Sequence, residues 1–362
     1  MKPHEYPETV RGMYEHLRSK LSTVVPTYEL KLKAEFAVDI NRIKKEKNAI
    51  ILGHNYMEPA LFHSVPDYTG DSLELSRIAA SSTCDTIVFC GVKFMAETAK
   101  ILNPDRTVLL PSPKGGCSLA ESVAAEDVRA LKERFPGVPT VTYVNTYADV
   151  KAECDYCCTS SNSAAVVRHL MEQGHQRVLF LPDEYLARNT AAELGLPFAV
   201  ARRGPDGDLH VESVPEDGPL LIGWQGRCEV HEKFTVEDVE NARKQFPDVF
   251  VLAHPECPPE VIEAADFSGS TSAMIRQVQQ METGRYLLLT ECSMGDNIVA
   301  SNPRAEMIRL CNLRCPHMGE ITLEQTLGAL LMDRYKIDVP EPVRSHARRS
   351  LERMIAILPP KP

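Results

Sequence analysis

Three cysteines, each a few residues after an apolar run, are the residues best suited to chemistry in this sequence: Cys117, Cys228 and Cys315. A residue in that position lies just past the carboxyl end of a strand, where ligands bind in open α/β sheets. Thiolates bind zinc and iron–sulfur clusters. Three thiolates leave one coordination position open, and an open metal can act as a Lewis acid on a substrate oxygen. The alternative is three unrelated loop cysteines.

Polar residues end other apolar runs. They form the triplets His54-Asn55-Tyr56, Tyr143-Val144-Asn145 and His254-Pro255-Glu256. An imidazole and a carboxylate two residues apart, as at His254 and Glu256, could hold a substrate and move its protons. His231, three residues after Cys228, is a further candidate. Each histidine alone could equally be a satisfied core or surface residue.

Hydroxyl-rich segments follow the triplets and precede helical patterns. They lie around Ser72, Ser160 and Thr271. Free backbone N–H groups and the helix dipole make such helix starts binding sites for anions. Each could also be an ordinary N-cap. Three of them at equivalent places favour a substrate with several anionic groups, such as carboxylates or a phosphate.

The elements that would position these residues alternate between strand and helix, and the alternation repeats three times. The interval from triplet to cysteine is 63, 85 and 61 residues in the three passes. The segment 196–219, rich in glycine, proline and aspartate, explains the longer middle interval as an inserted hairpin or loop. The pattern predicts an α/β fold of three similar three-layer α/β/α domains with parallel sheets around a pseudo-threefold axis, which brings one cysteine from each to a common point.

The predicted boundaries follow from this repeat. We expect an N-terminal helical segment at 1–46, α/β domains at 47–136, 137–247 and 248–340, and a C-terminal helix at 341–362. Pro26 should divide the first segment, with its second helix over 30–47. Helices are also predicted over the ranges 69–82, 93–102, 159–173, 184–194, 268–281, 321–335 and 344–358.

The composition is that of an ordinary globular protein: 25% of the residues are charged and 43% are apolar. The net charge of -10, with the basic residues scattered, argues against a nucleic-acid surface. No apolar run approaches 18 residues, and the first twenty are polar, so we expect no membrane span and a cytoplasmic location.

Eleven cysteines in such a chain favour metal ligation over disulfides. Cys154, Cys157 and Cys158 form a rival group that could be a zinc half-site or could fill a strand-to-helix turn. Cys228 and His231 could also be half of a zinc site, although no second CxxC or HxxxH completes it. The remaining ones beside apolar runs, Cys84, Cys90 and Cys292, are expected to be inert.

Many of these segments together resemble the quinolinate synthase family, the A protein of de novo NAD biosynthesis. The resemblance covers about residues 50–331 and rests on GHNY, TGDSLELS, FCGVKFMAETAKIL, GGCSLA, YVNT, TSSN, FLPD, WQGRCEVHEKF, HPEC, GSTS, CPHM and EITLEQTL, all in order. It implies a three-domain, pseudo-threefold fold around a four-iron, four-sulfur cluster with one open iron. The reaction it implies condenses iminoaspartate with dihydroxyacetone phosphate to quinolinate, phosphate and two waters.

The resemblance also implies residue roles. Cys117, Cys228 and Cys315 become the cluster ligands; Cys311 lies four residues upstream of the third, but the CPHM context favours Cys315. Glu256 becomes the acid/base residue, with Tyr56 and His231 close by. The implied substrate-binding residues are His54, Ser72, Tyr143, Asn145, Ser160, His254, Glu256 and Thr271.

The expected partners are the two small substrates and, in transient contact, the oxidase that supplies iminoaspartate. We expect no nucleic acid and no membrane, and a monomer or homodimer. Two alternatives stay open at this point. One is a redox or iron sensor that uses the same cluster without catalysis, and the other is a zinc hydrolase built on Cys154, Cys157 and Cys158.

Overall fold

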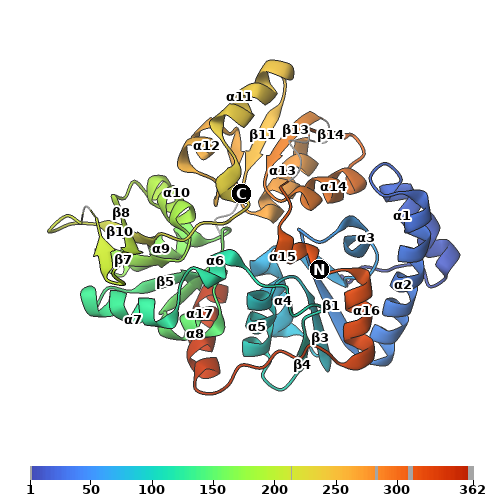
Figure 1. Ribbon diagram of the computed structural model, residues 1–362, viewed down its shortest axis with the longest axis horizontal. Helices are drawn as coiled ribbons and strands as arrows, with labels where there is room; N and C mark the ends of the chain where they lie inside the picture. Colours follow the sequence, from blue (N-terminus) through green and yellow to red (C-terminus); the bar gives the residue numbers. More distant parts are fainter. Residues whose placement is uncertain (1, 213, 282–283, 309–312, 358–362) are drawn as a thin grey trace.

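Three β-sheets, each with helices packed against it, are arranged around a common centre in the computed structural model (Figure 1). The structure describes residues 2–212, 214–281, 284–308 and 313–357. Two sheets have four strands and one has six. Every strand pairing is parallel except that of one hairpin, so the predicted fold class of three α/β units is confirmed.

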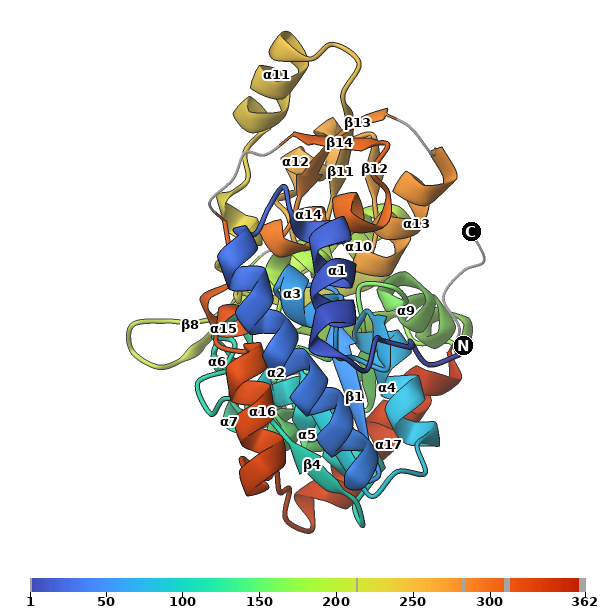
Figure 2. The same ribbon diagram turned by 90° about the vertical axis from the view of Figure 1, so that its right-hand side faces the viewer.

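The chain begins with two amphipathic helices, α1 (Val10–Leu21) and α2 (Thr27–Glu46), which pack together (Figure 2). Thr9 caps α1 by accepting a hydrogen bond from the amide of Gly12. Pro26 separates the helices, as predicted, but it is the N-cap of α2, which therefore starts earlier than expected. A proline fits there because backbone N–H groups at the start of a helix have no partner within the helix, so the N–H that proline lacks is not needed.

The first unit holds a four-stranded sheet in the order β2-β1-β3-β4. Its elements are β1 (Ala49–His54), α3 (Pro59–Phe62), β2 (Tyr68–Gly70), α4 (Ser72–Ser81), β3 (Thr86–Cys90), α5 (Lys93–Leu102), β4 (Thr107–Leu109) and α6 (Ser118–Glu121). Helices α4 and α5 pack against this sheet as one pair and α2 and α16 (Leu323–Met332) as another, and the sheet lies between the pairs in Figure 1.

The second unit contains the same strand order, β6-β5-β7-β10, extended by β8 and β9. Its elements are α7 (Ala125–Arg134), β5 (Thr140–Tyr143), α8 (Ala148–Glu153), β6 (Tyr156–Cys158), α9 (Ser163–Glu172), β7 (Arg177–Leu181), α10 (Glu184–Leu194), β8 (Phe198–Arg203), β9 (Leu209–Val211), β10 (Leu220–Trp224) and the 3-10 helix η1 (His231–Lys233). Strands β8 and β9 are antiparallel and form the inserted hairpin that the sequence predicted.

The third unit repeats the order as β12-β11-β13-β14. Its elements are α11 (Val236–Gln245), β11 (Phe250–Ala253), α12 (Pro259–Ala264), β12 (Phe267–Ser268), α13 (Thr271–Met281), β13 (Gly284–Leu289), α14 (Cys292–Ser301), β14 (Ala305–Ile308) and α15 (Pro316–Gly319). The domain boundaries given above remain a prediction, but each sheet draws its strands from one of the three predicted ranges.

Each unit contains one short strand that the sequence analysis did not predict. These strands, β2, β6 and β12, are two or three residues long and lie at a sheet edge, where a polar segment had been taken for a turn. Two predicted helices, 93–102 and 184–194, agree with α5 and α10. The helices after the edge strands start three or four residues later than predicted because part of the hydroxyl-rich segment is extended.

The last helix returns to the earlier units. Helix α17 (Val343–Ala356) packs against α8 and β6 of the second unit. Arg77 on α4 donates hydrogen bonds to the carbonyls of Ile355 and Ile357. Asn162, the N-cap of α9, donates to the carbonyls of Met354 and Ile357. The end of α17 therefore joins the middle of α4 to the start of α9, two helices from different units.

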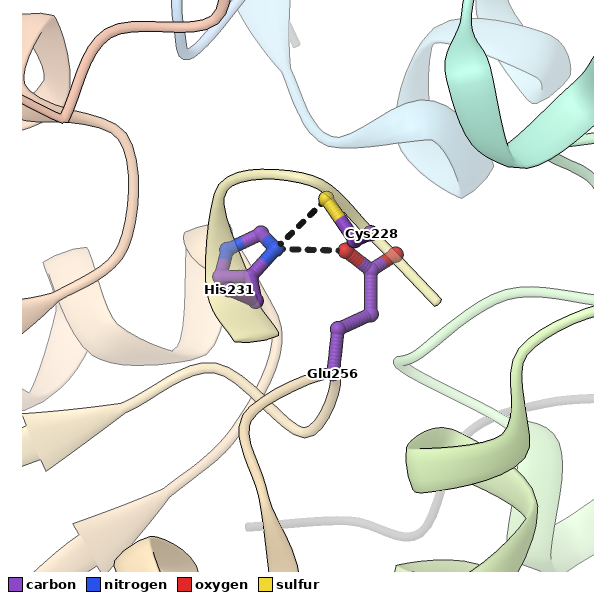
Figure 3. A group of neighbouring side chains, drawn as sticks. All are labelled: Cys228, His231 and Glu256. Carbon is purple, nitrogen blue, oxygen red and sulfur yellow. Dashed lines mark hydrogen bonds and ion pairs between the residues drawn. The ribbon is translucent and has the colours of Figure 1, made fainter. Parts of the chain in front are cut away.

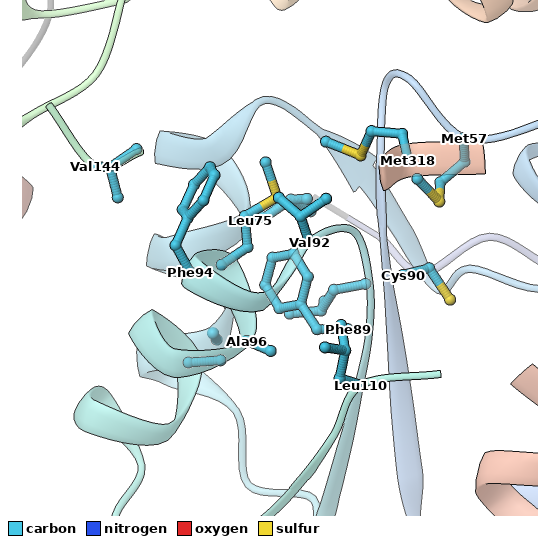
Figure 4. Close-up of a cluster of buried hydrophobic side chains, with 14 of the residues drawn as sticks. Met57, Leu75, Phe89, Cys90, Val92, Phe94, Ala96, Leu110, Val144 and Met318 are labelled. Atoms are coloured by element: carbon cyan, nitrogen blue, oxygen red, sulfur yellow. The ribbon is translucent and has the colours of Figure 1, made fainter. Parts of the chain in front are cut away.

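A buried core lies directly beneath the centre. Phe89 and Val92 of the first unit belong to it, and Phe94 packs there with Val144 of the second unit (Figure 4). Met318 from α15 joins the same cluster. The core is thus continuous between units, and its apolar side chains form the floor of the central pocket described next.

Candidate functional site

A pocket at the centre collects residues from all three units. Its volume is about 70 Å³, so substrates would need side chains or units to shift. The residues lining it include every predicted site residue: His54, Tyr56, Ser72, Cys117, Tyr143, Asn145, Ser160, Cys228, His231, His254, Glu256, Thr271 and Cys315. The structure brings these residues together, while their individual roles remain predictions.

The three cysteines reach the pocket from equivalent places. Cys117 directly precedes α6, Cys315 directly precedes α15, and Cys228 lies between β10 and η1. The loop before Cys228 turns closely past its neighbours because residue 226 is glycine: a Cβ there would lie 2.5 Å from the carbonyl oxygen of Pro182. Each unit therefore presents one thiol after the strand that ends the shared four-strand order: β4, β10 or β14.

Burial raises the pKa of all three thiols, to about 12 for Cys117, to about 11 for Cys315, and well above the usual value for Cys228. Such thiols stay protonated at neutral pH unless a bound metal takes the place of the proton. Among the described residues, the three sulfur atoms do not form a group tight enough to hold a single ion. A cluster separates its ligands farther than one ion does, so the absence of a single-ion group among these three described thiols leaves the predicted cluster as a proposal taken up below.

The Glu256 carboxylate and the His231 imidazole lie in close contact in the pocket (Figure 3). Nδ1 of His231 lies 2.6 Å from Oε2 of Glu256 and 3.1 Å from the Cys228 sulfur. Burial alone would raise the pKa of Glu256, but the neighbouring His231 and His254, with hydrogen bonds, lower it to about 2. At neutral pH this carboxylate can accept a proton.

Tyrosine hydroxyls surround the pair. The hydroxyl of Tyr56 lies 2.5 Å from Oγ1 of Thr290 and 3.5 Å from Nε2 of His231. Burial and the charge of Glu256 raise the pKa of Tyr56 and of Tyr143 well above 10, so both hydroxyls stay protonated. In the structure the Tyr143 hydroxyl is engaged with Glu256 and that of Tyr56 with Thr290, so each would have to turn to donate to a substrate oxygen.

His54 and His254 are neutral. Burial lowers the pKa of His54 to about 4 and that of His254 to about 3. The ring of His254 stacks on His231 with 4.6 Å between the centroids. Asn145 donates a hydrogen bond of 3.3 Å to Oε1 of Glu256. These groups can orient a substrate through hydrogen bonds without adding charge.

The three hydroxyl-rich helix starts meet at Asp71, a residue that the sequence analysis did not single out. Oδ1 of Asp71 accepts from the amides of Leu73 and Glu74 and so caps α4. Oδ2 accepts from Ser161 of the second unit at 2.9 Å and from Ser270 of the third at 3.1 Å. One carboxylate thus ties together the segments that carry Ser72, Ser160 and Thr271.

Glu291 was also missed. It lies in the pocket lining just after β13, where its carboxylate accepts from the amide of Ser293 and caps α14. Burial raises its pKa to about 7, which makes it a second group able to carry a proton near neutral pH. The run RYLLLTE ends in this residue, so the strand-end reasoning applied to the triplets could have found it.

The rival cysteine group lies elsewhere. Cys154, Cys157 and Cys158 are buried in apolar clusters, and the Cys157 thiol donates to Oγ of Ser350. Among the residues that the structure describes, they do not make a group close enough to bind a metal. Cys311, the alternative third ligand, lies outside the described residues.

A larger cavity, of about 480 Å³, lies between the N-terminal segment and the first and third units. Its lining includes His16, His63 and Arg276 but no cysteine. The larger cavity also holds shifted groups, such as His63, whose pKa burial lowers to about 3, but Cys117, Cys228, Cys315 and the predicted acid/base residue Glu256 all line the smaller pocket. The chemistry is therefore assigned to the smaller pocket. No helix of the described residues is both long and apolar enough to span a bilayer.

Comparison with known proteins agrees with the resemblance seen in the sequence. The family model described as quinolinate synthetase A protein matches residues 38–356. Quinolinate synthase 2 of Mesorhizobium japonicum is 47% identical over 352 residues, which cover 96% of this chain and 99% of the relative. Quinolinate synthase of Caulobacter vibrioides is 45% identical over 342 residues, covering 94% and 87%. That of Xylella fastidiosa is 49% identical over 318 residues, covering 88% and 86%.

The family model spans most of the chain, and these relatives align with it over nearly their whole lengths. The chain belongs to the quinolinate synthetase A protein family.

Proposed function

We propose that this chain catalyses the quinolinate synthase reaction of NAD biosynthesis in the central pocket, condensing iminoaspartate with dihydroxyacetone phosphate. Membership of the family, with curated relatives that are quinolinate synthases, supports an enzyme over a sensor or a zinc hydrolase. The single observation that carries the pocket assignment is the convergence of Cys117, Cys228 and Cys315, one from each unit, beside Glu256.

The three cysteines would hold a four-iron, four-sulfur cluster. When bound with one iron free of protein ligands, it supplies a Lewis acid for the departing hydroxyl groups. The burial that raises the thiol pKa values supports this, because a thiol in such surroundings becomes a thiolate only with a metal beside it. The protein residues supply the remaining chemistry.

The helix starts would bind the anionic substrates. The hydroxyls of Ser72, Ser160 and Thr271, with backbone N–H groups at the starts of α9 and α13, would offer donors to carboxylates and a phosphate, whereas the amides of Leu73 and Glu74 at the start of α4 already donate to Asp71. Asp71 holds these segments in register but is itself an anion, so it acts as a structural tie and should not contact a substrate carboxylate.

Proton transfer would begin at Glu256. Its lowered pKa leaves it ionised, so it accepts a proton from a substrate carbon or nitrogen, directly or through His231. Tyr56 and Tyr143 donate hydrogen bonds to substrate oxygens, and neutral His54 and His254 orient the substrate. A closed, buried pocket keeps water from the imine.

An anaerobic assay tests this function. Protein purified without oxygen should carry about four irons per chain and form quinolinate from the two substrates. Protein with its full iron content that forms no quinolinate from them would contradict the proposal. A transient contact with the oxidase, the oligomeric state and a cytoplasmic location stay predictions.

A further inference from the structure

The Cys228-x-x-His231 pair, which looks incomplete in the sequence, gains a third member in the structure. Ligand atoms of Cys228, His231 and Glu256 all lie within 4.8 Å of one another. Figure 3 shows the sulfur and the carboxylate on the same side of the imidazole, both facing Nδ1. His231 and Glu256 are each about 2% exposed. Such a compact group is distinct from the wider set of three cysteines.

We propose that the cluster-free chain binds one divalent zinc ion at Cys228, His231 and Glu256. Thiolate, imidazole and carboxylate are the three ligand types that zinc takes in proteins, and three protein ligands leave a fourth position for water. Binding replaces the thiol proton, which passes to the buffer, and involves no change of oxidation state.

Outer contacts already orient these ligands. Nε2 of His231 lies 3.0 Å from Oγ1 of Thr290, which fixes the ring with Nδ1 toward the other two ligands. Asn145 contacts the Glu256 oxygen that does not face His231. The ligands therefore need little rearrangement to surround an ion.

Zinc at this site and the proposed cluster exclude each other, because both need the sulfur of Cys228. Cys117 and Cys315 take part in the cluster alone, and His231 and Glu256 in the zinc site alone. The competition between zinc and the cluster rests on the proposed function. The zinc site itself depends only on Cys228, His231 and Glu256. Zinc should therefore block cluster assembly until a chelator removes it.

Titration calorimetry with zinc chloride on the full, cluster-free chain tests the site. We expect one zinc per chain. Glu256→Gln, His231→Gln and Cys228→Ser should each weaken binding by more than the 10- to 100-fold or so that loss of an outer-shell partner costs. The matched controls Glu291→Gln, His54→Gln and Cys117→Ser line the same pocket and should stay within about twofold of the unsubstituted chain. Circular dichroism checks that each variant is folded. If His231→Gln does not fold, His231→Asn replaces it.

A different ligand set would overturn the proposal. If Cys117→Ser and Cys315→Ser weaken zinc as much as Cys228→Ser does, while Glu256→Gln and His231→Gln do not, the three thiols hold the ion. Absence of binding to the unsubstituted chain would also overturn it. Cobalt as a probe gives a second reading, since the charge-transfer absorption of one thiolate is weaker than that of three. Quinolinate formation by the cluster-loaded chain tests the proposed function separately.

Discussion

The chain contains two groups of three cysteines, and they contrast sharply. Cys154, Cys157 and Cys158 are neighbours in the sequence, yet each is buried among apolar side chains and they form no metal group among the described residues. The other three, Cys117, Cys228 and Cys315, are about a hundred residues apart and line one pocket. Proximity in the sequence thus does not predict which cysteines share a pocket.

The difference lies in where each group sits on its strands. Cys157 and Cys158 lie within β6, and successive residues of a strand point to opposite faces, so they cannot converge. The pocket cysteines follow the ends of strands, where three sheets face one another and polar residues collect. Chemistry in this fold is found at strand ends.

Substitution of cysteines by alanine in each group should give the largest contrast in iron content and in activity. Cys117→Ala, Cys228→Ala and Cys315→Ala should each lose the iron and lower kcat/KM about a thousandfold or more, because a Lewis acid contributes several kcal/mol. Cys157→Ala should keep both. Iron analysis and the quinolinate assay measure this, and an iron-free Cys157→Ala would reverse the assignment of the two groups.

Substitution of Glu256 separates metal binding from proton transfer within the pocket. Glu256→Gln keeps the shape and an acceptor but cannot take a proton, so kcat should fall about 10²- to 10⁴-fold. Iron content should not change, since only the cysteines hold the cluster. A loss of iron parallel to the loss of activity would place Glu256 with the ligands.

Loss of the link between the units should have a smaller effect. Asp71→Ala removes a buried carboxylate that accepts hydrogen bonds from Ser161 and Ser270. Hydrogen bonds to charged groups contribute about 1.5–3 kcal/mol each. Their loss should let the proposed anion-binding segments move apart, so we expect KM to rise about tenfold or more. Iron should remain, and Ser161→Ala should show part of the effect. An unchanged KM in both variants would contradict this role for Asp71.

The smallest predicted effect concerns the ionisation of a thiol in the inert group. Burial raises the pKa of Cys158 well above 9, so the folded chain keeps its proton where the unfolded chain loses it. A raised folded pKa contributes stability that is present below about pH 9 and is lost above it. Cys158→Ala should therefore destabilise the protein by about 1 kcal/mol less at pH 10 than at pH 8. Urea unfolding at both values measures this; a penalty that grows with pH would mean that Cys158 is a thiolate in the folded protein.

Much of the architecture was predictable because it repeats. Three strand-and-helix passes, with one cysteine after each, predicted three parallel sheets, and the long middle interval correctly identified the β8–β9 hairpin. The edge strands β2 and β12 were missed because two or three residues carry no periodicity. A strand that short is defined by the neighbour it pairs with, which the local sequence does not reveal.

The pocket was predictable in its members but not in its contacts. Glu256 could be named from HPEC, but its pairing with His231 depends on how the second and third units meet. Asp71 looked like an ordinary cap of α4, and only the assembled chain shows Ser161 and Ser270 at its free oxygen. Such links between distant segments have no local signal.

The position of α17 has a consequence for the order in which the molecule is completed. Asn162 at the start of α9 and Arg77 in the middle of α4 donate hydrogen bonds to the carbonyls of residues 354, 355 and 357, which are synthesised nearly two hundred residues or more afterwards. During translation the first two units can build their sheets early. The hydrogen bonds that join α4 and α9 to the end of α17, however, can form only after the ribosome has released those carbonyls.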